Sequence, residues 1–136
     1  MSKPELNHVG IIVADLDQAV AFFSQVFETS PFWVKEMPAV GLRLAEFELA
    51  NTCVELLQYT DKEPGFASRV MGQGTGLNHI SLNVDDLQAA IDRLTAQGLR
   101  LMDGFPRQGA HGQVAFFEPD TAMDVLLEIC QPEHEE

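Results

Sequence analysis

The stretch LNHVGIIVADLDQAV at residues 6–20 recurs, with changes, as LNHISLNVDDLQAAI at residues 77–91. Seven of the fifteen paired positions are identical, and His8 corresponds to His79 at an offset of 71 residues. In each copy an apolar, strand-like run leads to an Asp-Leu pair, and an aspartate at this place is typical of the cap that starts a helix. The chain is therefore predicted to contain one structural unit twice.

Each copy continues in the same order, with a helix followed by three strands. The expected strands are residues 33–37, 41–49 and 52–59 in the first copy, and 99–104, 113–119 and 124–131 in the second. Apolar residues at helical spacing are expected in the core: Phe22, Phe23, Val26 and Phe27. The predicted fold class is α+β, with two βαβββ modules pairing into a cupped mixed β-sheet and helices outside. The modules are placed at 5–60 and 76–132, joined by a linker at 61–75 with one short helix, and residues 1–136 form a single domain.

The composition is that of an ordinary globular protein, with 46% hydrophobic and 21% charged residues, and no apolar run approaches a membrane span. A formal net charge of −13 argues against nucleic acid as a partner, because phosphate contacts require clustered cations. No secretory apolar segment follows the first residues, which favours the cytoplasm. Cys53 and Cys130 lie in apolar strand-like runs and are expected to be reduced thiols that pack in the core.

Glutamates recur with the histidines, because the strands TCVELLQ and VLLEICQ match Glu55 to Glu128 at an offset of 73 residues. A carboxylate inside an apolar strand is costly to bury unless it is paired or bound to a metal. Two imidazoles and two carboxylates suit a divalent ion such as Zn, Ni, Co, Mn or Fe(II). Taken singly, each residue could instead be a core histidine or a solvent-facing glutamate. Their recurrence at matched positions favours a metal site made of His8, Glu55, His79 and Glu128.

Five stretches resemble the vicinal oxygen chelate superfamily across essentially the whole chain: LNHVGIIVADLDQAVAFF, TCVELLQ, LNHISLNVDDLQAAIDRL, GAHGQVAFFEP and VLLEIC. Within it, PRQGAHGQVAFFEP and the glycines before LNHISLNVDDL are most similar to the methylmalonyl-CoA epimerases, with glyoxalase I as close kin. The resemblance implies ligand positions at His8, Glu55, His79 and Glu128, and one divalent ion (Zn, Co, Ni, Mn or Mg). It also implies a conflict, because glyoxalase I has glutamate at the position of Glu55, where epimerases often have glutamine.

Both reactions implied by the resemblance remove a proton next to a carbonyl and pass through an enediolate, which a metal would stabilise as a Lewis acid. Glu128 is the first candidate for the catalytic base, with Glu55 as its symmetric partner. The resemblance also implies a base on the third strand of the first module. Leu44 occupies that position, and Glu46, two residues on, is a further candidate for the base. Glu46 could instead be an ordinary glutamate on the exposed side of a strand.

The function expected is therefore a metal-dependent epimerase that removes the proton alpha to a thioester carbonyl, with a glyoxalase I-like lactoylglutathione lyase as the alternative. The expected substrate is an acyl-CoA thioester or a glutathione hemithioacetal, and a homodimer is expected. Rival classes are an extradiol-type dioxygenase with Fe(II) and a non-catalytic small-molecule binding protein. Cations that could meet the phosphates of CoA at the rim are Lys35, Arg43, Arg69 and Arg107.

Overall fold

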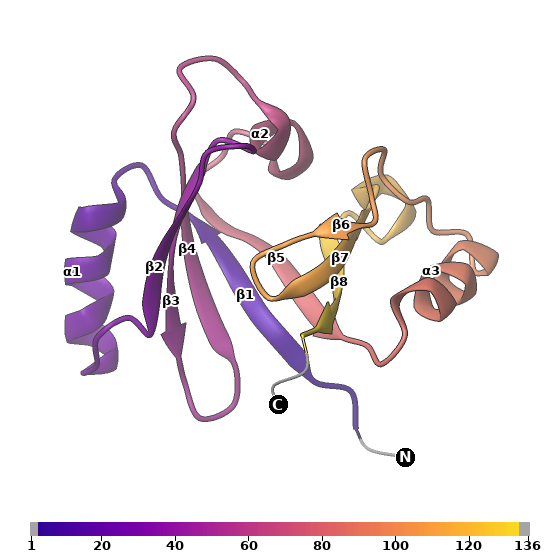
Figure 1. Ribbon diagram of the computed structural model, residues 1–136, viewed down its shortest axis with the longest axis horizontal. Coiled ribbons are helices and arrows are strands. Elements are labelled where there is room, and N and C mark those ends of the chain that lie inside the picture. Colours follow the sequence, from indigo (N-terminus) through magenta and orange to yellow (C-terminus); the bar gives the residue numbers. More distant parts are fainter. Residues whose placement is uncertain (1–2, 134–136) are drawn as a thin grey trace. The chain divides into compact units, whose positions relative to one another are not determined.

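The computed structural model describes residues 3–133, which divide into two compact units. The N-terminal unit comprises residues 8–78, and the C-terminal unit comprises residues 79–133 together with 3–7. Each unit is built on a βαβββ module, so the predicted α+β class and the duplication are confirmed (Figure 1). Within the described residues, no helix combines the length and the apolar character needed to cross a membrane.

The N-terminal unit contains a four-stranded mixed sheet in the order β2-β3-β4-β1. Its elements are β1 (Leu6–Ile12), α1 (Leu16–Phe27), β2 (Trp33–Met37), β3 (Leu42–Glu48), β4 (Cys53–Tyr59) and α2 (Phe66–Met71). Strand β1 runs parallel to β4, whereas β2, β3 and β4 are antiparallel neighbours. The short helix α2 lies in the segment predicted to be a linker.

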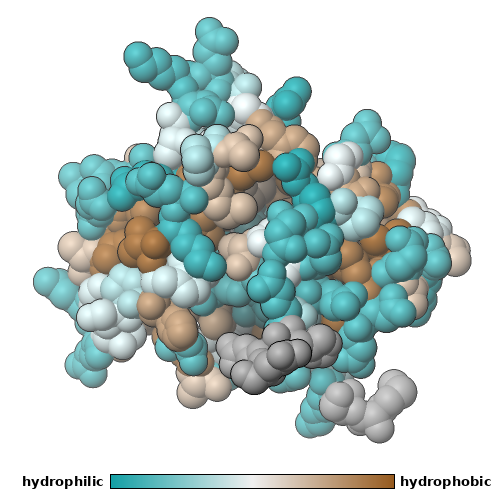
Figure 2. Space-filling view, in the orientation of Figure 1, coloured by the Kyte–Doolittle hydropathy of each residue, from teal (hydrophilic) through white to brown (hydrophobic). Residues whose placement is uncertain are grey.

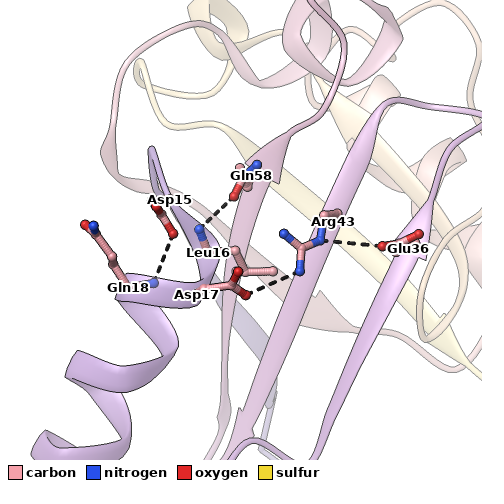
Figure 3. A network of polar contacts seen from close by, with 7 residues as sticks. All are labelled: Asp15, Leu16, Asp17, Gln18, Glu36, Arg43 and Gln58. Atoms are coloured by element: carbon pink, nitrogen blue, oxygen red, sulfur yellow. Dashed lines mark hydrogen bonds and ion pairs between the residues drawn. The ribbon is translucent and has the colours of Figure 1, made fainter.

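Two side chains fix the start of α1 (Figure 3). The Asp15 carboxylate accepts a hydrogen bond from the Gln18 N–H at 3.0 Å, as predicted for an N-cap. The Gln58 side-chain oxygen, at the end of β4, accepts one from the Leu16 N–H at 2.7 Å. Since the first N–H groups of a helix have no partner within it, these bonds tie the helix to the sheet.

The C-terminal unit repeats this plan with the strand order β5-β8-β7-β6. Its elements are β5 (Gly76–Asn83), α3 (Leu87–Ala96), β6 (Arg107–Gln108), β7 (Gly112–Phe117), the 3-10 helix η1 (Pro119–Thr121) and β8 (Leu127–Pro132). Asp86 caps α3 through the Ala89 N–H at 3.0 Å. The Gln131 side-chain oxygen accepts from the Leu87 N–H at 2.9 Å, so the glutamine bond is duplicated as well.

Two predictions about local structure are wrong. Residues 99–104 do not form a strand, because the segment makes one isolated bridge, Leu101 to Phe117, before it turns at Gly104 with φ +90°. Phe22 and Val26 are 59% and 55% exposed, so they are not core residues. Consecutive helical residues point about 100° apart, so Phe22 cannot share the buried side that Phe23 occupies. Apolar surface is visible in Figure 2 on the left, where Figure 1 shows α1 and β2.

Candidate metal centre

One face of the sheet in the N-terminal unit carries polar side chains from three strands. Helix α1 covers the other face, where Leu16 packs with Phe47, Val54 and Leu56. Because side chains alternate along a strand, the residues between these point to the opposite face. We call this the polar face of the N-terminal unit; its functional side chains are His8 on β1, Glu46 on β3, and Cys53 and Glu55 on β4.

His8 and Glu55 are neighbours on this face. The His8 Nδ1 atom lies 3.5 Å from Glu55 Oε2, and the two residues are 3% and 4% exposed. Parallel pairing of β1 with β4 creates the contact, because it sets His8 opposite Cys53 and Gly10 opposite Glu55. The structure therefore brings together the imidazole and the carboxylate that the sequence predicted for the first module.

Glu46 lies directly opposite Glu55 in the antiparallel register of β3 and β4. It is 4% exposed, so its reading as an exposed strand glutamate is wrong. Trp33 is opposite Glu46 on its other side, and the Lys35 ammonium lies 4.4 Å from the centre of the Trp33 ring. Directly opposed like charges on neighbouring strands are destabilising, so this face favours an added positive charge.

The negative character of this face is also evident at Cys53. Burial, followed by the charges of Glu46 and Glu48 and a hydrogen bond to the Glu46 side chain, raises the pKa of the Cys53 thiol from 9.0 to about 11. Each of these causes disfavours the thiolate. Cys53 and Cys130 are both free thiols, and Cys130 is buried in the core as predicted, whereas Cys53 is half-buried on the polar face and is not a core residue. Cys53 is therefore a neutral thiol near neutral pH and a poor nucleophile.

The C-terminal unit has a corresponding polar face. Helix α3 covers Ala115, Phe117 and Ile129 on the other side of its sheet. His79 Nε2 lies 3.9 Å from Glu128 Oε1, and each residue is 5% exposed. The His79 ring meets the Phe116 ring edge-on, with 5.3 Å between their centres. The second predicted pair is thus also adjacent and buried, against an aromatic wall.

Ser81 is a buried polar residue on this face that the sequence analysis missed. It follows His79 by two residues in β5 and therefore points to the same side. In the parallel register of β5 and β8, it lies opposite Glu128. The signal was present in the sequence, since a serine two residues after a proposed ligand in a strand shares its face.

Each histidine–glutamate pair fits a divalent cation. Imidazole nitrogen and carboxylate oxygen are ligands for Zn²⁺ and related ions at about 2.0–2.2 Å, so two such atoms on one ion lie about 3–3.5 Å apart. The separations of 3.5 Å for His8–Glu55 and 3.9 Å for His79–Glu128 are close to this spacing. Both carboxylates are buried, where a bound cation would offset the cost of removing them from water.

One of the predicted rim cations is used elsewhere. Arg43 lies on β3 near the start of α1, as Figure 3 shows, and its guanidinium contacts Asp17 at 3.4 Å and Glu36 at 3.6 Å. Gln58, the residue opposite Arg43 in the register, bonds the helix start, so Arg43 is on the helix side of the sheet. It is therefore directed away from the polar face.

Comparison with known proteins gives a consistent family. A profile of the glyoxalase/bleomycin resistance protein/dioxygenase superfamily matches residues 7–117. The chain is 33% identical to the ethylmalonyl-CoA/methylmalonyl-CoA epimerase of Cereibacter sphaeroides, covering 93% of this chain and 96% of that protein. It is 32% identical to the mitochondrial methylmalonyl-CoA epimerase of Dictyostelium discoideum, covering 92% of this chain and 76% of that protein.

A solved structure agrees with these relatives. The methylmalonyl-CoA epimerase of Mycobacterium tuberculosis superposes with a TM-score of 0.83 and 28% identity, covering 96% of this chain and 89% of that chain. A more distant relative is the probable lactoylglutathione lyase of Vibrio parahaemolyticus, which is 26% identical over 96% of this chain and 95% of that protein. The similarity thus extends over almost the whole length of the chain.

Proposed function

Because the chain belongs to the glyoxalase/bleomycin resistance protein/dioxygenase superfamily, we propose that it is a metal-dependent epimerase acting on the carbon alpha to a thioester carbonyl. The observation that supports this most is the duplicated pair of a buried histidine and a buried glutamate, His8 with Glu55 and His79 with Glu128. An enzyme of this superfamily is also supported by the epimerase and lyase relatives.

We assign His8, Glu55, His79 and Glu128 as ligands of one divalent ion per chain. Such an ion would act as a Lewis acid, stabilising the negative charge that develops on the substrate oxygen as the proton leaves. The four side chains contribute two neutral nitrogens and two negative oxygens, which offset the charge of the ion. Their burial holds them in place and limits competition by water.

Proton transfer falls to carboxylates of the polar faces. Epimerisation requires removal of a proton from one face of the carbon and delivery to the other, so two groups are needed. Glu55 and Glu128 each stand beside a histidine and are assigned as ligands first. Glu46 is buried directly opposite Glu55 and is our candidate for a base that does not also bind the metal.

The substrate proposed is an acyl-CoA thioester. The support comes from the named activities of the Cereibacter and Dictyostelium relatives, each at least 32% identical over more than nine-tenths of this chain. Lys35, Arg69 and Arg107 remain candidates for contacts with the CoA phosphates, whereas Arg43 does not. The homodimer and the cytoplasmic location expected from the sequence remain predictions.

The test is proton exchange in D₂O with the metal-loaded protein. Methylmalonyl-CoA should lose its α-proton signal by NMR, and removal of the metal with a chelator should stop the exchange. Glu128→Ala should reduce the rate by at least about a hundredfold and weaken metal binding. Full activity in that variant, or unchanged exchange after complete removal of the metal, would contradict the proposal.

A lactoylglutathione lyase is the second candidate, and one observation favours it. Glu55 supplies a carboxylate at the position where the resemblance to glyoxalase I, rather than to the epimerases, implies one. The same protein preparation should therefore be offered the hemithioacetal of glutathione and methylglyoxal. Turnover of the hemithioacetal without α-proton exchange in methylmalonyl-CoA would favour the lyase and reject the epimerase.

A further inference from the structure

Ser81 is a buried polar side chain for which the fold of the described residues gives no evident reason. It is 0% exposed in the middle of β5, and its hydroxyl makes no hydrogen bond to any residue from 3 to 133. A buried hydroxyl without a partner lowers stability, and native proteins rarely keep one. The hydroxyl is therefore expected to serve a state of the protein other than the ligand-free one.

The first copy of the repeat indicates that the strand itself does not require this serine. The offset of 71 residues that relates the two histidines also relates Ser81 to Gly10. Gly10 lies opposite Glu55 in the same way that Ser81 lies opposite Glu128. The same strand position thus tolerates a residue with no side chain, and the hydroxyl is a specific property of the C-terminal copy.

We propose that Ser81 is a positioning residue whose hydroxyl donates a hydrogen bond to the Glu128 carboxylate when that carboxylate binds the divalent ion. This inference rests on the proposed function. Neighbouring strands lie about 4.8 Å apart, and Ser81 and Glu128 are partners in the parallel register of β5 and β8, so the serine hydroxyl can turn to meet the carboxylate. Groups that bond to a ligating carboxylate orient it and strengthen its binding to the metal.

The consequence is that the two proposed ligand glutamates, Glu128 and Glu55, have different roles. Glu128 faces a neutral donor, Ser81, and is held as a ligand. Glu55 faces a second carboxylate, Glu46, and no side chain at Gly10. A hydroxyl bond that retains Glu128 on the ion disfavours its departure to act as a base. That bond favours Glu46, rather than Glu128, as the group that removes the proton.

The test is the affinity for Zn²⁺, measured by competition with a chromophoric chelator, together with the melting temperature of the metal-free protein. Ser81→Ala should weaken Zn²⁺ binding by about tenfold or more. The metal-free Ser81→Ala protein should melt no lower than the wild type, because the hydroxyl lost has no partner there. Ser81→Gly, which matches the first copy, should weaken Zn²⁺ binding by the same factor.

Ser68→Ala is the matched control. Ser68 is also a buried serine, but its hydroxyl bonds to Gly65, accepting from the N–H at 3.0 Å and donating to the carbonyl at 3.2 Å. Its loss should lower the melting temperature and leave the affinity for Zn²⁺ unchanged. The pair of serines separates a role in metal binding from a role in folding.

Three results would overturn the inference. Wild-type affinity in Ser81→Ala would reject it and leave the proposed function standing. A loss of affinity that grows from Ala to Gly, together with a falling melting temperature, would indicate packing instead. Failure of the wild-type protein to bind Zn²⁺, Co²⁺ or Mn²⁺ would reject both the inference and the proposed function.

Discussion

Glu46 and Glu55 face each other across β3 and β4, each 4% exposed, so two carboxylates share one buried patch of the N-terminal unit. His8 contacts one of them, and the Cys53 thiol bonds to the other. Opposed carboxylates repel, so the arrangement carries a cost in stability that a purely structural sheet would avoid. Such a cost is typical of functional sites, where a cation or a proton in transfer offsets it.

Glu46→Gln should separate catalysis from metal binding. The change keeps the shape of the side chain and removes its ability to take a proton, so the exchange rate should fall by about 10²–10⁴-fold. The affinity for Zn²⁺ should fall by no more than about tenfold, and by less than in Glu55→Ala, since Glu46 adds negative charge beside the ligand Glu55 but is not assigned as a ligand itself. NMR exchange and chelator competition provide the two measurements.

Glu48→Gln is the control for that variant. Glu48 lies two residues further along β3 and is exposed. The Glu48→Gln substitution removes the same charge from the same strand without altering the buried pair of Glu46 and Glu55. Activity should therefore stay within about twofold of the wild type, as for most surface substitutions. Equal losses in both variants would indicate a general effect of charge and would reject Glu46 as the base.

The number of ions bound distinguishes one shared centre from two separate ones. Equilibrium dialysis with metal analysis should give one ion per chain, and Glu55→Ala should weaken binding by more than the roughly 10–100-fold expected for loss of a supporting group. Glu55→Gln keeps an oxygen donor and should lose less. Two ions per chain, with Glu55→Ala removing one of them, would show that each histidine–glutamate pair binds its own ion.

Cys53 should react slowly with thiol reagents in the folded protein. With a pKa of about 11, only about one thiol in a thousand is ionised at pH 8. Labelling by an aromatic disulfide reagent should therefore be roughly a hundredfold slower than for an ordinary exposed thiol, and it should rise about tenfold per pH unit toward pH 11. The experiment uses Cys130→Ala, so that Cys53 alone is observed.

The same pKa predicts the direction of a pH effect on stability. Because the thiol pKa is higher in the folded protein than the usual 9.0, the neutral thiol stabilises the fold below pH 9. That contribution is lost as the pH rises from 9 through about 11. Cys53→Ala should flatten the fall in stability over this range. Rapid reaction of Cys53 with the thiol reagent at pH 8 in the folded protein would contradict the raised pKa on which both predictions rest.

The two glutamines that bond the helix starts should contribute similarly to stability. Gln58→Ala and Gln131→Ala each remove an acceptor from a helix N–H, at 2.7 Å and 2.9 Å, and should each cost about 1 kcal/mol. Hydrogen exchange should localise the effects, with faster exchange at Leu16 in the first variant and at Leu87 in the second. Gln25→Ala, on the exposed side of α1, should cost almost nothing.

The repeated motif was sufficient to predict most of the fold. Apolar runs with an aspartate cap located β1, α1, β5 and α3, and alternation located β2 to β4 and the faces of His8 and Glu55. The segment at 99–104 was mistaken for a strand because its composition is that of one. Its pairing with β7 is limited to one bridge, a tertiary fact that no local pattern reveals.

The burial of Glu46 could not be predicted for a different reason. Strand β3 lies between β2 and β4 and is buried on both faces from Leu44 to Phe47. The exposure of a glutamate there is decided by the neighbouring strands, and local alternation in the sequence does not reveal it. Ser81 was missed because a serine in an apolar strand is common. What distinguishes it is the residue opposite, Glu128, which is 47 positions away.

The bond from Gln58 to Leu16 also acts as a check on strand register. A slip of β4 by one residue would exchange its two faces. Gln58 would then leave the start of α1, and Glu55 would turn from the polar face into the space occupied by apolar helix residues. One misalignment would thus disrupt the helix and dismantle the proposed ligand pair together. Gln131 couples the position of Glu128 to the start of α3 in the same way. In each copy, one correct strand register is therefore needed both for the helix start and for the proposed ligand pair.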